Sequence, residues 1–69
     1  MIDEVSYSPA GMTFPPTLNI RRGKHHVHIA VRGPAVYVNG DLRPGETVRI
    51  DLTLHEFRKL WHDAQGLVR

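Results

Sequence analysis

Apolar and polar side chains alternate along most of residues 17–52. A period of two is typical of strands that bury one face, because successive side chains of a strand point to opposite sides of the sheet. The alternation predicts four strands, at residues 17–22, 25–32, 35–39 and 47–52. We expect the inward side chains to be those of Leu18, Ile20, Val27, Ile29, Val31, Val36, Val38, Val48, Ile50 and Leu52.

Turn-forming residues separate these segments and suggest how they pair. Gly23-Lys24 and Gly33-Pro34 both suit two-residue hairpin turns. The first turn would place Ile20 opposite Val27. The second would place Ile29 opposite Val38 on the inward face and Ala30 opposite Tyr37 on the outward face. Each register brings inward residues together, as a buried face requires. The connection to the last strand is longer and contains two further turn signals, Asn39-Gly40-Asp41 and Arg43-Pro44-Gly45.

A helix is predicted directly after the last strand. Thr53-Leu54-His55-Glu56 has the form of a capping box, in which Thr53 is the N-cap residue. Apolar residues then recur at helical spacing, at Leu54, Phe57, Leu60, Trp61 and Ala64. We expect this helix to cover the inward face, with Leu54, Phe57 and Leu60 packed on Val27, Ile29, Val38 and Ile50.

The predicted fold class is therefore α+β, a four-stranded antiparallel meander with one C-terminal helix packed on one face. Residues 17–69 would form this single ββββα domain. Residues 1–16 contain Pro9, Pro15 and Pro16 and are expected to form an irregular N-terminal arm, although Ile2, Val5 and Tyr7 could form a short strand.

Size and composition narrow the picture further. The chain has 69 residues and no cysteine, so it forms one domain with a marginal core and has neither disulfides nor thiolate metal sites. A marginal core and two open sheet edges favour a homo-oligomer, most simply a dimer. No apolar run is long enough for a membrane span, and the acidic start of the chain does not resemble a signal peptide. The cytoplasm is the expected location.

The outward face of the predicted sheet is the first candidate for a binding surface. Five of its residues are expected to form one contiguous cationic patch with an aromatic centre: Arg21, His26, His28, Tyr37 and Arg49. Arginine and tyrosine are frequent at interface hot spots. The net charge of +2 is only mildly basic. An ordinary solvated polar face is therefore the competing interpretation.

Catalytic and metal chemistry find little support in the sequence. His26 and His28 project from one face, but their expected neighbours, Arg21 and Asn39, suit a metal ion poorly, so no metal or cofactor is predicted. The two serines lie in the N-terminal arm without a nucleophile elbow, and no glycine-rich phosphate loop is present. A histidine-based nuclease is chemically allowed. The prediction is a protein that is not an enzyme.

Residues 49–60 read Arg-Ile-Asp-Leu-Thr-Leu-His-Glu-Phe-Arg-Lys-Leu. This strand-to-helix element resembles the closing element of small accessory proteins from GC-rich bacteria and their phages. The resemblance implies a non-enzymatic protein-interaction module, such as a phage-encoded modulator of a host protein. Two alternatives stay open. One is a small nucleic-acid-binding regulator that uses the basic sheet face, and the other is a structural virion component that assembles through sheet edges.

Overall fold

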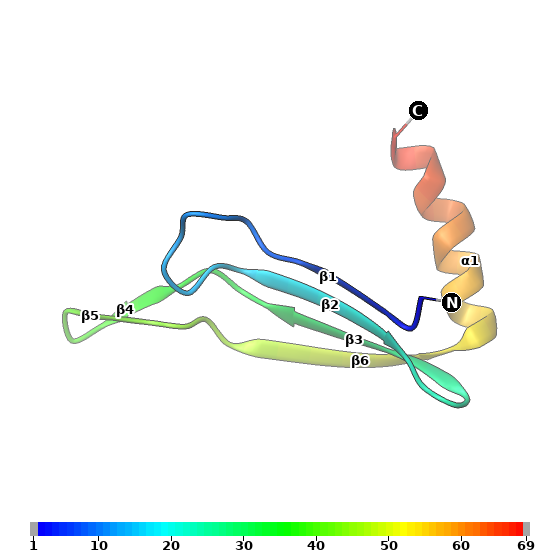
Figure 1. Ribbon diagram of the computed structural model, residues 1–69, viewed down its shortest axis with the longest axis horizontal. Helices are drawn as coiled ribbons and strands as arrows, with labels where there is room; N and C mark the ends of the chain where they lie inside the picture. Colours follow the sequence, from blue (N-terminus) through cyan, green and yellow to red (C-terminus); the bar gives the residue numbers. More distant parts are fainter. Residues whose placement is uncertain (1, 69) are drawn as a thin grey trace.

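The computed structural model describes residues 2–68 as a small antiparallel sheet with a projecting hairpin at one end and a helix at the other (Figure 1). The elements in chain order are β1 (Glu4–Tyr7), β2 (Thr17–Arg22), β3 (His26–Arg32), β4 (Val36–Val38), β5 (Asp41–Arg43), β6 (Thr47–Thr53), α1 (Leu54–Ala64) and a 3₁₀ turn, η1 (Gln65–Val68). No helix within residues 2–68 is long and apolar enough to cross a membrane.

The α+β class and the four-stranded antiparallel sheet are confirmed, but one strand of the sheet differs from the prediction. The strand order is β1-β2-β3-β6, and β4 and β5 form a separate two-stranded sheet. The fourth strand is thus β1, within the segment expected to be an irregular arm, and not the segment around Tyr37. Val5 of β1 lies opposite Ile20, so β1 continues the inward apolar pattern of β2.

The hairpin between β2 and β3 has a different register from the predicted one. Ile20 lies opposite Ile29 and Arg21 opposite His28, each two residues further along β3 than expected. Gly23 donates its N–H to the carbonyl oxygen of His26, with 2.7 Å between nitrogen and oxygen, so the turn is centred on Lys24 and His25. A shift of two residues leaves every side chain on its predicted face, because strands have a period of two.

The predicted turn at Gly33-Pro34 is wrong. The chain continues past it into β4 and turns at Asn39-Gly40, both of which have positive φ angles, 51° and 83°. Such a pair of angles is what a type I′ hairpin turn requires. One register then runs through the whole hairpin, from Val38 opposite Asp41 at the tip to His26 opposite Thr53 at the base.

Gly45 lies where this long hairpin leaves the four-stranded sheet. A Cβ atom at Gly45 would collide with the carbonyl oxygens of Gly33 and Pro34 on the opposite arm of the hairpin. The backbones can approach this closely only because residue 45 has no side chain. Beyond this point, β4 and β5 pair with each other alone and extend past the end of the sheet (Figure 1).

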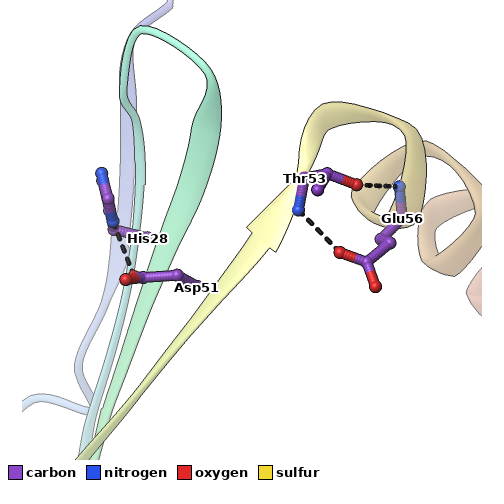
Figure 2. Close-up of polar contacts among 4 residues, drawn as sticks. All are labelled: His28, Asp51, Thr53 and Glu56. Atoms are coloured by element: carbon purple, nitrogen blue, oxygen red, sulfur yellow. Dashed lines mark hydrogen bonds and ion pairs between the residues drawn. The ribbon is translucent and has the colours of Figure 1, made fainter.

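The helix and its predicted N-terminus are confirmed. Thr53 is the N-cap residue, and its Oγ1 accepts a hydrogen bond from the Glu56 backbone N–H, with 3.1 Å between the two atoms. The Glu56 carboxylate accepts in return from the Thr53 N–H at 2.9 Å, which completes the capping box (Figure 2). Hydrogen bonding to the Glu56 carboxylate, from the Thr53 backbone N–H first and from the Thr53 side chain second, lowers the pKa of this carboxyl.

The position of the helix differs from the expectation. It contacts the sheet only at β6 and β3 and otherwise projects away from the end of the sheet (Figure 1). Leu54 and Phe57 share a groove with Val27. The predicted contact with Val38 is wrong, because Val38 lies in β4, and Leu60 and Ile50 are both about half exposed. Val27 is the one apolar side chain among residues 2–68 that is buried.

Candidate functional site

The sheet presents two very different faces, and each is a possible functional surface. The polar face carries Glu4, Ser6, Asn19, Arg21, His28, Ala30, Arg49 and Asp51, and at its two ends Thr17, His26, Arg32, Thr47 and Thr53. The inner face carries Val5, Tyr7, Leu18, Ile20, Val27, Ile29, Val31, Val48, Ile50 and Leu52, together with Arg22 beside Val27.

Acidic and basic side chains follow one another across the polar face. The strand registers place Arg21 between Glu4 of β1 and His28 of β3, and His28 between Arg21 and Asp51 of β6. The His28 Nδ1 and Asp51 Oδ1 atoms are 2.6 Å apart (Figure 2). Both side chains are substantially exposed. An exposed contact of this kind adds little to stability, but it orients the imidazole ring on the surface.

A second row of the polar face leaves a hollow. Ala30 lies between Asn19 and Arg49, and its small side chain leaves space between these longer neighbours. The hollow is lined by Asn19, Arg21, His28, Ile29, Ala30, Arg49 and Asp51. Asn19 is held in place because its side-chain amide donates to Glu4 Oε1 at 2.9 Å and to Ser6 Oγ at 2.7 Å.

The structure brings together three of the five predicted binding residues. Arg21, His28 and Arg49 line the same hollow, and Arg21 and Arg49 are exposed. His26 lies two residues before His28, at the start of β3 and opposite Thr53. Tyr37 does not join them, because it lies in β4 and pairs with Leu42 of the projecting hairpin. The expected aromatic centre of the patch is therefore absent, and the single contiguous patch is wrong for Tyr37.

The N-terminal arm does not cover this face. It crosses the far corner of the sheet, where the Arg32 guanidinium donates to the Pro15 carbonyl oxygen from Nε at 3.2 Å and from Nη2 at 2.7 Å. No group of three or more histidine, aspartate or glutamate side chains within residues 2–68 is arranged to hold a metal ion. The polar face is thus open and of mixed charge, and it differs from the cationic patch that the sequence predicts.

Apart from Arg22 at the end nearest the helix, the inner face is apolar, and it is largely uncovered. One row crosses all four strands, from Tyr7 through Leu18 and Val31 to Val48. The exposed fractions along this row are 66%, 38%, 45% and 67%, although Leu18 and Val31 belong to the two central strands. A central strand normally has its apolar side buried on the core. Nothing among residues 2–68 covers this row.

Exposure of the inner face falls toward the helix. In the next row, Ile20 and Ile29 are half-buried between the more exposed Val5 and Ile50. In the row nearest the helix, Val27 is only 5% exposed. The helix therefore closes only one end of the face, and beside it lies an open groove lined in part by Val5, Leu54, Phe57 and Trp61.

The sequence does contain a signal for this open face. Inward residues spread over four strands need a cover about as long as the strands themselves. One helix of eleven residues that leaves the last strand without a connecting loop can reach only its own end of the sheet. The alternation with a period of two shows only which residues point inward. It does not show that the inward face is larger than the area that the helix can reach.

Comparisons with protein-family models, with curated proteins and with solved structures find no match to this chain.

Proposed function

We propose that this chain is a small, non-enzymatic protein-interaction module that binds another polypeptide through the inner face of its sheet. The observation that carries the proposal is the exposed row from Tyr7 to Val48 across all four strands. Contiguous exposed apolar surface on a soluble domain marks an interaction site, whereas single exposed apolar residues are ordinary. A modulator of a host protein, which the sequence resemblance implies, is one form that such a module takes.

The polar face supports this proposal less well than the inner face. Arg21 lies beside Glu4, and Arg49 and His28 lie beside Asp51, so basic side chains are interleaved with carboxylates. Nucleic-acid affinity depends on neutralising phosphates with an excess of basic side chains. Without Tyr37 the face also lacks a base-stacking platform. A protein partner on the inner face is therefore preferred over a nucleic acid on the polar face.

Site-specific photo-crosslinking tests the proposal in cells of the natural source. A benzophenone amino acid is placed at Val31, on the inner face, or at its chain neighbour Ala30, on the opposite face of the same strand. The protein with benzophenone at position 31 should form a covalent adduct of discrete mass with its partner. The protein with benzophenone at position 30 should form much less of this adduct. Equal labelling from both positions, or no adduct from Val31, would contradict the proposal.

A further inference from the structure

The free edge of β6 has an exposed set of backbone hydrogen-bonding groups. Gly33 donates its N–H to the Glu46 carbonyl oxygen at 3.0 Å, which makes these two residues a hydrogen-bonded pair of the long hairpin. Hydrogen-bonded pairs alternate along an antiparallel ladder. Val48, Ile50 and Leu52 therefore turn their backbone groups toward β3, and the intervening residues turn theirs outward, away from the sheet.

The outward groups belong to Thr47, Arg49, Asp51 and Thr53. No further strand within residues 2–68 pairs with this edge, because β6 ends the strand order. The N–H of Thr53 is already bonded to the Glu56 carboxylate. The backbone N–H and C=O groups of Arg49 and Asp51, and those of Thr47, are the ones that a new strand could bind.

This edge carries few of the features that block strand pairing. Edge strands are usually protected by proline, lysine, bulges or a very short length. β6 is seven residues long and contains no proline, glycine or lysine, and it pairs with β3 without a bulge. At the other edge of the sheet, β1 has only four residues. The β6 edge is therefore the better site for adding a strand.

The sequence of β6, Thr-Val-Arg-Ile-Asp-Leu-Thr, is complementary to itself in the antiparallel direction. When two copies are centred on Ile50, Arg49 of each lies opposite Asp51 of the other. Val48 then lies opposite Leu52, Thr47 opposite Thr53, and Ile50 opposite its own copy. Opposite charges, threonine pairs and aliphatic pairs are all favourable cross-strand combinations.

Neighbouring registers are much less favourable. A shift that places Arg49 opposite its own copy sets two cations together, and a shift that places Asp51 on the symmetry axis sets two carboxylates together. Like charges directly opposite each other destabilise a sheet. A register in which one strand is displaced by an odd number of residues along the other would place inner-face residues opposite polar-face residues. The centred register alone combines opposite charges with matched faces.

We propose that two copies of this chain associate through β6 about a two-fold axis at Ile50, so that their two four-stranded sheets become one continuous sheet. Such a contact uses the same surface of both copies and closes at a dimer. Asp51, already beside His28, then lies between His28 and the second copy's Arg49, so the alternation of charge on the polar face continues across the axis. This proposal concerns the edge of the sheet and is independent of the partner proposed for the inner face.

A charge exchange at two positions tests the register directly. Arg49→Asp places carboxylates opposite each other in the dimer, and Asp51→Arg places guanidinium groups opposite each other. Each single variant should weaken the dimer about tenfold or more. An equimolar mixture of the two single variants should form a mixed dimer. The first variant has carboxylates at positions 49 and 51, and the second has guanidinium groups at both positions, so opposite charges face each other across the axis. Sedimentation velocity and native mass spectrometry measure these states.

Matched controls separate this effect from net charge. Arg43→Asp and Asp41→Arg make the same charge changes at exposed positions of β5, outside the proposed interface, and should leave the dimer unchanged. A wild-type chain that is still monomeric at about 100 µM, a concentration at which even a weak specific contact is populated, would overturn the proposal. So would single variants that associate as the wild type does, or a mixture that does not associate.

Hydrogen exchange tests the same pairing in the wild-type chain, so this measurement does not require any variant to fold. In the wild-type chain, the outward N–H groups of Arg49 and Asp51 should exchange more slowly as the protein concentration rises. The N–H of Ile50 faces β3 and serves as the internal reference. Association that leaves Arg49 and Asp51 unprotected would point to the inner face instead and would refute pairing at β6.

Discussion

Replacing Thr53 by alanine should unwind much of α1 while leaving the sheet intact. The substitution removes Oγ1, the acceptor for the Glu56 backbone N–H. Loss of an N-cap side chain costs about 1 kcal/mol, or a factor of about five in the helix equilibrium. The effect should be large here because α1 has eleven residues and none of them is buried. Isolated helices of this length are marginal in water, and little packing offsets the loss.

The helix population is measured by Cα chemical shifts over residues 54–64 and by circular dichroism at about 222 nm. Thr53→Ser keeps the hydroxyl and serves as the matched control, with most of the helix retained. Thr47→Ala removes an exposed threonine at the other end of β6 and should leave the helix unchanged. If Thr53→Ala left the shifts of residues 54–64 unaltered, packing and not capping would hold the helix, and the reasoning would be refuted.

Three further predictions concern pH, the hinge of the long hairpin, and the groove beside the helix. The pKa of Glu56 is held below its ordinary value of 4.5, so the capping contribution is complete above that pH and is lost as pH falls through the lowered pKa, which an NMR titration of the helix detects. Gly45→Ala should cost roughly 1–3 kcal/mol through its collision with Gly33 and Pro34. Weakened cross-strand contacts in β4 and β5, with β1 to β3 unaffected, would be its signature. Phe57→Ala should cost only about 1–2 kcal/mol in chemical denaturation, because Phe57 is half-buried in an open groove. A loss as large as that of a fully buried phenylalanine would show that something covers the groove in solution.

The face on which each strand residue lies could be predicted from the sequence, because alternate residues of a strand point to opposite faces whatever the pairing of the strands. The β2–β3 register differs by two residues from the expected one, and yet Ile20 and Ile29 stay on the inner face as predicted. The helix start was equally accessible, since the Thr53 capping box is a local signal that depends on four neighbouring residues. Local patterns of this kind are independent of how distant strands pair.

The strand order could not be predicted in the same way, because two turn signals compete in residues 33–40. A turn at Gly33-Pro34 would pair β3 with only the short segment around Tyr37. The turn at Asn39-Gly40 lets β3 pair along its whole length with β6, in the same register as the tip. The larger number of ladder hydrogen bonds favours the second arrangement. The strength of either turn signal alone does not distinguish the two arrangements. They are distinguished only when the complete strand pairing that follows from each turn is compared.

The candidate site was only partly predictable for a related reason. Arg21, His28 and Arg49 are brought together as expected, because their face follows from parity. Tyr37 is separated from them, because its strand is not part of the four-stranded sheet. The exposure of Val31 depends on where α1 lies, and periodicity shows only which residues of α1 are apolar, not which strands they reach.

The single register of the long hairpin also bears on how the chain folds. Asn39-Gly40 closes the smallest possible loop, at low entropic cost, and each following pair then adds to an existing ladder. Zipping from this tip would bring β3 and β6, which are distant along the chain, into contact without a second costly closure. We therefore expect the projecting β4–β5 segment to act as a nucleation site for the central ladder. Replacing it by a flexible linker of the same length should slow folding far more than it lowers the stability of the finished sheet.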